Sequence, residues 1–98
     1  MLFSVRITNY QNNLMLNICD APLLGKKVVK NKIKMHISES YYGERLVEKD
    51  EAENLLKKCC SINMVGKETI SLSVRLGIGS HQGVKEIGGV PFLIVFKM

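Results

Sequence analysis

The sequence lacks several features of secreted and membrane-embedded proteins. It has three cysteines among 98 residues, and an odd number with an adjacent pair, Cys59 and Cys60, does not form a disulfide framework. Its longest apolar run, residues 92–96, is far shorter than the roughly 20 residues that a membrane-spanning helix needs. The first ten residues alternate in polarity, which predicts a strand and not a signal peptide. We therefore expect a cytoplasmic protein whose cysteines are small buried side chains.

Complete metal-binding or nucleotide-binding motifs are also missing. Gly77, Gly79 and Gly83 approach a dinucleotide fingerprint, but the spacing is off by one residue and no helix is predicted to follow. The pair Gly66-Lys67 lacks the upstream glycine and the following Ser or Thr of a phosphate loop, although free backbone N–H groups there could still meet an anion. The histidines and cysteines have no spacing that is typical of metal ligands. We expect neither a metal nor a cofactor.

Catalytic groups are equally sparse. His81 lies in a glycine-rich connection and could act as a base, but no nucleophile lies near it in the sequence. The acidic residues cluster on a predicted helix, where they favour its dipole and its solubility. We therefore expect a protein that is not an enzyme, and an enzyme that uses His81 is the weakest hypothesis.

What the sequence does contain is an excess of positive charge. Its 14 basic residues outnumber 9 acidic residues, which gives a formal net charge of +5. Such a balance suits an anionic partner, of which nucleic acid is the commonest. The charge is concentrated in residues 23–38, which include no acidic residue and five lysines: Lys26, Lys27, Lys30, Lys32 and Lys34.

The polarity pattern predicts an α+β fold in one domain, with a mostly antiparallel sheet and two helices inserted between its N-terminal and C-terminal strands. Residues 2–9 and 14–19 form a predicted hairpin, and residues 84–87 pair with residues 90–97 across the turn Gly88-Gly89. Residues 92–96 are apolar on both faces, so we expect a strand covered on both sides. Residues 48–60 have one apolar face and form the clearest helix. The spacing of residues 67–76 fits a strand, with a helix as the open alternative.

The lysine-rich segment is predicted to bend at Gly25 and to continue as one strand over residues 31–38. On such a strand Lys30, Lys32, Lys34 and His36 share one face, and Lys26 and Lys27 extend it. Alternate residues lie about 6.6 Å apart, close to the phosphate repeat of an extended single strand. Tyr41 and Tyr42 follow in a predicted loop and could stack on bases, and Arg45 could bind a phosphate. Two alternatives remain open: the lysines only keep an outer strand soluble, and Tyr42 anchors the core.

Four stretches together resemble an archaeal family called domain of unknown function 424, which is described as predicted RNA-binding proteins. They are "CDAPLLGKK", "SESYYGERLV", "SINMVGKETISLSVRLGI" and "EIGGVP", and they occur in this order. The resemblance covers residues 14–96. It implies an archaeal cytoplasmic protein near the translation apparatus, and it implies that residues 67–76 form a helix. It implies no catalytic residues. Phe92 departs from the family pattern, in which a polar residue is expected.

The leading hypothesis is a small RNA-binding protein, with ribosomal RNA or a ribosomal subunit as candidate partners. Its expected binding residues are Lys26, Lys27, Lys30, Lys32, Lys34, His36, Tyr41, Tyr42 and Arg45. The alternative is a protein–protein interaction module that acts as a translation or RNA-processing cofactor. It would use an exposed strand or the apolar segment "GGVPFLIVF". We expect no contact with a membrane.

Overall fold

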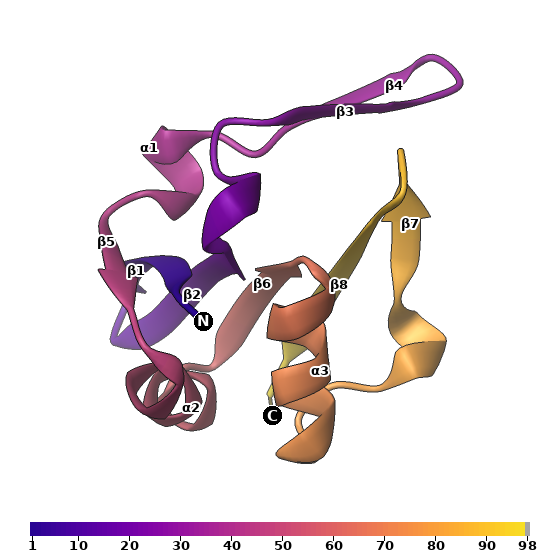
Figure 1. Ribbon diagram of the computed structural model, residues 1–98. Coiled ribbons are helices and arrows are strands. Elements are labelled where there is room, and N and C mark those ends of the chain that lie inside the picture. The colour runs from indigo at the N-terminus through magenta and orange to yellow at the C-terminus, as the bar shows by residue number, and fades with distance from the viewer. Residues whose placement is uncertain (98) are drawn as a thin grey trace.

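A six-stranded sheet forms the centre of the structure, a computed structural model that describes residues 1–97 (Figure 1). Its strand order is β5-β1-β2-β6-β8-β7, and neighbouring strands are antiparallel except for the parallel pair β2 and β6. The strands are β1 (Phe3–Tyr10), β2 (Asn13–Asp20), β5 (Arg45–Val47), β6 (Ser61–Val65), β7 (Lys85–Ile87) and β8 (Val90–Phe96). The predicted α+β fold with a mostly antiparallel sheet is confirmed.

Two helices cover one face of this sheet. They are α2 (Lys49–Lys58) and α3 (Lys67–Arg75), and both contact β2. The main core lies between these helices and the sheet, and it includes Leu16, Ile18 and Leu56. A one-turn helix, α1 (Glu39–Tyr42), contacts β1 and β2 from the other side (Figure 1). We call this other side of the sheet the open face.

Both predicted hairpins are present, and tight turns close them. Gln11 and Asn12 have φ values of 50° and 68° between β1 and β2. Gly88 and Gly89 have φ values of 57° and 82° between β7 and β8. Two successive residues with positive φ are typical of the type I′ turn, whose twist matches that of the flanking strands.

The helical predictions need two adjustments. Residues 67–75 form a helix, as the resemblance implies, although their alternation fits a strand. The helix that was predicted over residues 48–60 is α2, and it ends at Lys58. Cys59 has extended backbone angles, and Cys60 leads into β6. The central strand β6 was not predicted. Its five residues run parallel to β2, a pairing between segments that are far apart in the sequence.

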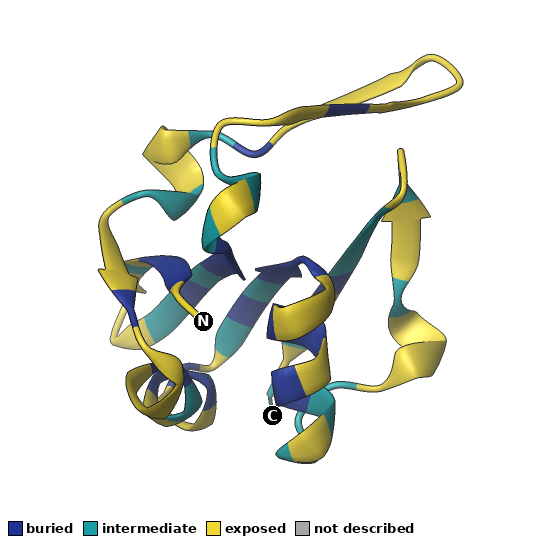
Figure 2. Ribbon diagram, viewed as in Figure 1, coloured by how far each residue is buried: buried dark blue, intermediate teal, exposed yellow. Residues whose placement is uncertain are grey.

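The lysine-rich segment forms a hairpin and not the single strand that was predicted. Strands β3 (Lys27–Lys30) and β4 (Ile33–His36) make a separate two-stranded sheet, joined by a turn in which Asn31 has a φ of 58°. We call residues 27–36 the lysine hairpin. It extends from the body above the β7–β8 turn, and most of it is exposed (Figures 1 and 2).

The hairpin turn also changes which lysines share a face. Paired residues lie on the same side of a sheet, and the pairs are Lys27 with His36 and Val29 with Lys34. Lys30 pairs with Ile33 on the opposite side, where its Nζ donates to the backbone oxygen of Glu86 at 3.3 Å. Of the four residues predicted to share one face, Lys34 and His36 do so, whereas Lys30 lies on the other face and Lys32 lies in the turn. A two-residue turn reverses the alternation, so even-numbered residues before it match odd-numbered residues after it.

A second, smaller core fixes the base of the lysine hairpin to the sheet. Val28 and Ile37 of the hairpin segment are buried against Cys19 and Val65 on the open face. Two backbone hydrogen bonds extend the pairing beyond the hairpin, from the N–H of Gly25 to the oxygen of Ile37 and from the N–H of Ile37 to the oxygen of Lys26. The hairpin therefore has an anchored base and an exposed tip.

The C-terminal part of strand β8 is covered on one face only, which corrects the prediction that residues 92–96 are buried on both sides. Leu93 packs in the main core, while Ile94 and Phe96 on the open face are 59% and 72% exposed. Within residues 1–97, no helix has the length and apolar character needed to cross a membrane.

The three cysteines differ in accessibility. Cys19 and Cys59 are buried, and Cys60 is exposed, which corrects the expectation that all three are buried. Burial and the neighbouring Asp20 raise the pKa of Cys19 to about 12, and burial also raises that of Cys59. Because the thiolate is the nucleophile, both should stay unreactive in the folded protein.

We expect a maleimide at pH 7.5 to label Cys60 alone, and all three cysteines in denaturant, as counted by mass spectrometry. Labelling of Cys19 in the native protein would contradict this burial.

Candidate nucleic-acid interface

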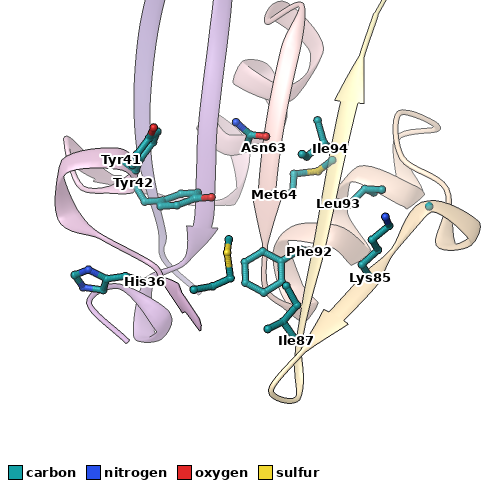
Figure 3. A pocket seen from close by; sticks show the side chains of 12 residues that line it. His36, Tyr41, Tyr42, Asn63, Met64, Lys85, Ile87, Phe92, Leu93 and Ile94 are labelled. Atoms are coloured by element: carbon teal, nitrogen blue, oxygen red, sulfur yellow. The ribbon is translucent and has the colours of Figure 1, made fainter. Parts of the chain in front are cut away.

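A cleft of about 650 Å³ lies on the open face, between α1, the lysine hairpin and strands β6 to β8. Its volume falls within the roughly 300–1,000 Å³ that is usual for small-molecule sites. Figure 3 shows the side chains around it, and none of them is acidic. The lining residues are Met35, His36, Tyr41, Tyr42, Asn63, Met64, Gly83, Lys85, Ile87, Phe92, Leu93 and Ile94.

The floor of the cleft is part of a row of side chains that crosses four strands. Arg6 pairs with Asn17, Asn17 with Asn63, and Asn63 with Ile94. Paired residues on neighbouring strands share a face, and the strands lie about 4.8 Å apart. The open face therefore presents, in order, a guanidinium, two amides and an apolar side chain.

The two amides are held by a chain of hydrogen bonds. Asn63 Nδ2 donates to Asn17 Oδ1 at 2.8 Å, and Asn17 Nδ2 donates to the backbone oxygen of Tyr41 at 3.0 Å. The chain has one direction, because a backbone carbonyl can only accept. Asn63 consequently turns its nitrogen towards β2 and its oxygen towards β8, as Figure 3 shows.

Aromatic rings form two sides of the cleft. Tyr42 comes from α1, and its ring points across the cleft towards Phe92 of β8 (Figure 3). Tyr41 is exposed, with its ring centroid 6.4 Å from that of Tyr42. Burial first, then Cys19 and Tyr41, raise the pKa of Tyr42, so its hydroxyl stays protonated at neutral pH. Ser4 holds this turn in place by donating from Oγ to the backbone oxygen of Tyr42 at 2.6 Å.

A lysine and a histidine border the cleft on two sides. Lys85 projects from the edge strand β7, and His36 lies on the other side at the end of β4, where its imidazole points away from the centre (Figure 3). Lys27 and Lys34 share the face of the hairpin that carries His36. Lys26 and Lys32 are exposed at the base and at the turn of the lysine hairpin.

Arg45 lies apart from the other predicted binding residues. It pairs with Val5 of β1, whose side chain faces the helices, and its guanidinium forms an ion pair with Glu51 of α2. The structure therefore brings His36, Tyr41 and Tyr42 to the cleft. It places four of the five predicted lysines on the adjacent lysine hairpin and Lys26 at its base, and it leaves Arg45 on the helical side of the sheet.

Nine of the twelve residues that line the cleft were not among the predicted RNA-binding residues, and four of these nine matter most for the site: Asn63, Lys85, Phe92 and Ile94. They belong to three strands whose adjacency depends on the order of the sheet. One signal was available. Asn17 and Asn63 each stand between two apolar residues of their strand. Because successive side chains of a strand point to opposite faces, a polar residue between apolar neighbours indicates the less buried face.

The predicted anion position at Gly66 is already occupied by a side chain of the protein. Asp20, at the end of β2, accepts the N–H groups of Glu68 at 3.1 Å and Thr69 at 2.8 Å, and the Thr69 hydroxyl at 2.7 Å. The carboxylate thus caps α3 and takes the place that a phosphate would occupy.

Elsewhere in residues 1–97, no group of three or more His, Cys, Asp or Glu side chains could hold a metal ion. His81 is exposed on the short 3-10 turn His81–Gly83 and is not among the residues that line the cleft.

Comparisons with known proteins agree with this fold. No functionally curated protein matches the chain. An uncharacterized conserved protein from Methanopyrus kandleri has a similar crystal structure, with a TM-score of 0.82 and 24% identity over 100% of this chain and 95% of that one. At this identity the likeness concerns the fold alone. The family model described as protein of unknown function DUF424 matches residues 8–98, nearly the whole chain. The chain therefore belongs to the DUF424 family.

Proposed function

We propose that the protein binds single-stranded RNA and that it acts without catalysing a reaction. Unpaired bases would lie on the open face, and the phosphates would lie towards the lysine hairpin. The observation that carries this proposal is the position of the cleft. The exposed ring of Tyr41 and the half-buried side chains of Tyr42, Phe92 and Asn63 lie beside residues 26–34, which carry five exposed lysines, and none of the residues that line the cleft is acidic. Stacking on aromatic rings beside a positive groove is the common mode of single-strand binding.

The shape of the site favours an unpaired strand over a duplex. In duplex RNA the bases are stacked and paired, and the deep major groove is closed to side chains. The cleft is recessed between the hairpin base and the sheet, so a base must leave its stack to reach Asn63 or Phe92. The lysines alone would attract both forms of RNA through their phosphates.

Fluorescence anisotropy with a labelled oligonucleotide tests this proposal directly. We expect the single strand to bind at least about tenfold more tightly than its own duplex in 0.1 M salt. Each base that stacks on an aromatic side chain of the protein contributes about 1–3 kcal/mol, and the paired bases of a duplex are not free to stack there. Removal of one exposed ring, by Tyr41→Ala, should weaken single-strand binding and leave duplex binding unchanged. Equal affinity for both forms, or no binding, would refute the proposal.

The cell compartment and partner that we propose are the cytoplasm and the translation apparatus, as the described role of the resembled family suggests. Ribosomal RNA or a ribosomal subunit is the first target to examine. Sedimentation of native lysate should then show the protein with a ribosomal subunit, and nuclease treatment should release it.

A protein–protein interaction module is the second candidate, and the exposed apolar end of β8 favours it. Ile94 and Phe96 present apolar side chains on the open face, where exposed apolar patches often mark binding sites for other proteins. In that case the protein would act as a translation or RNA-processing cofactor. Its complex would survive nuclease treatment and would be lost in Phe96→Ser.

A further inference from the structure

The backbone groups of β8 point alternately to its two edges. In an antiparallel pair of strands, every second pair of opposite residues exchanges hydrogen bonds. The Gly66 N–H donates to the Pro91 oxygen at 2.9 Å, and the Lys97 N–H donates to the Cys60 oxygen at 2.8 Å. These bonds lie at the two ends of the β6–β8 pairing, so they fix which residues of β8 are bonded to β6.

The odd-numbered residues of β8 are therefore bonded to β6, and the N–H and C=O groups of Ile94 and Phe96 point to the opposite edge. Strand β7 covers that edge only as far as Phe92. Figure 1 shows β8 continuing beyond the start of β7 towards the C-terminus. Among residues 1–97, no backbone hydrogen bond reaches Ile94 or Phe96 from the uncovered side. We call this side of residues 94–96 the free edge.

The free edge is accessible as well as unpaired. The connection between α3 and β7 packs on Leu93, because an added Cβ on Gly79 or Gly83 would meet the Leu93 side chain at 2.8 or 3.0 Å. Leu93 belongs to the main core on the helical side. One residue further along, the side chains of Ile94 and Phe96 are mostly exposed on the open face. Apolar surface and unpaired backbone groups thus lie side by side.

Other exposed strands carry charges that oppose the addition of a further strand. Strand β5 has Arg45, β7 has Lys85 and Glu86, and the strands of the lysine hairpin have three lysines. Charged residues on edge strands commonly protect them from pairing with other chains. Residues 93–96 include no charge and no proline. The free edge is thus the unprotected edge of the described sheet.

A second copy of this chain fits the free edge poorly. In a symmetric antiparallel pair, both residues of each free edge find a partner only if Ile94 lies opposite Phe96 of the other copy. Lys97 would then lie directly beside Lys85 of that copy, which occupies the next position along the same edge. Crowding and repulsion between like charges both oppose this arrangement.

The surrounding charges instead favour an acidic occupant. Residues 76–85 and 90–97 include no acidic side chain. Lys85 projects on the open face at the point where β7 ends the free edge, whereas Glu86 pairs with Pro91 and lies on the other face. An acidic residue at the end of an added strand would therefore meet Lys85.

We infer that the free edge of β8 accepts an extended segment of another protein as an added strand, in line with β7. The backbone of the segment pairs with Ile94 and Phe96, its alternate apolar side chains lie beside theirs, and an acidic residue at its end faces Lys85. This contact does not depend on RNA, and it gives the protein-interaction candidate a binding mode. Its failure would leave RNA binding in the cleft to its own tests.

An NMR titration of the isotope-labelled natural protein tests the inference. The probe is a short synthetic peptide in which valine and threonine alternate between a pair of glutamates at each end. We expect it to shift the amide signals of Ile94 and Phe96. It should also slow their hydrogen exchange about tenfold when its concentration is about ten times the Kd, because only unbound protein exchanges there. Unchanged exchange at both residues would overturn the inference.

The lysine hairpin supplies an internal comparison, since its charge also attracts an acidic peptide. The amide of Lys32, at the hairpin turn, should keep its exchange rate. A peptide that protects Lys32 and not the free edge would refute the assignment to β8. Protection of Ile94 and Phe96 that grows with protein concentration in the absence of peptide would assign the edge to a second copy, and it would refute the inference too.

Two substitutions at Phe96 separate backbone pairing from apolar contact. Phe96→Ala removes the ring and keeps the N–H that points to the free edge. Phe96→Pro removes both and spares the bonds to β6. We expect the proline variant to bind the peptide about fivefold more weakly than the alanine variant, the effect of one lost backbone hydrogen bond. Equal affinities would refute backbone pairing. If Phe96→Pro does not fold, the exchange rates of the natural protein still decide.

A charge exchange tests the acidic nature of the occupant. A peptide with lysines in place of the glutamates should bind the natural protein at least about fivefold more weakly. In Lys85→Glu the difference between the two peptides should shrink or reverse. Equal binding of both peptides to the natural protein would refute an acidic partner.

Discussion

Replacement of Gly66 by alanine is expected to lower the free energy of unfolding by about 4 kcal/mol or more, since it combines backbone strain with loss of a helix cap. Gly66 has a φ of 108° and a ψ of 153°, a region that is nearly exclusive to glycine. An added Cβ would lie 2.4 Å from the carboxyl carbon of Asp20. Asp20 cannot retreat without losing its three bonds to Glu68 and Thr69. Chemical denaturation measures the loss.

Two matched variants separate strain from collision. Gly77→Ala also places alanine at a positive φ, of 74°, but its Cβ would meet nothing within 4 Å, so we expect a cost of about 1 kcal/mol from strain alone. Asp20→Ala should cost about 3 kcal/mol, because it removes the cap and leaves the buried Thr69 hydroxyl without a partner. Gly66→Ala should cost clearly less in the Asp20→Ala background than alone. Strict additivity would show that the two residues do not collide.

This cap also shows where prediction from the sequence ends. The resemblance implied a helix after Gly66, and that part was right, but the N–H groups that were expected to be free at its start are bound by a carboxylate of the protein. The side chain that fills the position lies 46 residues earlier, at Asp20, and only the parallel pairing of β2 with β6 brings it there. Local patterns predicted the hairpins and α2 because turns and helices depend on neighbours in the sequence. They could not predict β6, whose partners are all distant.

The same limit explains the errors in the binding site. Alternation of lysines and apolar residues has the same period in one long strand and in a hairpin, so the segment alone could not reveal the turn at Asn31. Apolar residues on both sides of β8 indicated burial, but Ile94 and Phe96 face outwards. The tyrosines and His36 were predicted because they follow the lysines directly. Asn63 and Phe92 lie near these residues only because of the order of the strands in the sheet, which the sequence did not predict.

The lysine hairpin provides the second large expected effect. Each phosphate that a single strand brings to a lysine contributes about 0.7 to the slope of log K against log salt. Loss of three such contacts should therefore reduce the slope by about 2 and weaken binding about a hundredfold in 0.1 M salt. The suitable triple variant is Lys27→Gln, Lys32→Gln and Lys34→Gln. It spares Lys30, whose Nζ already donates to the backbone of β7.

The helical side of the molecule offers a control of equal charge. Lys49, Lys57 and Lys58 are exposed on α2, across the sheet from the cleft, and their replacement by glutamine removes the same three charges. General attraction between a positive protein and RNA would fall equally in both triple variants, because it depends on net charge. A bound strand that follows the hairpin would lose affinity in the hairpin variant, while the α2 variant should change by less than about threefold at a Debye length of about 10 Å. Salt titrations of both variants by anisotropy make the comparison. Equal losses would mean that the hairpin lysines serve solubility and that the RNA contact lies elsewhere.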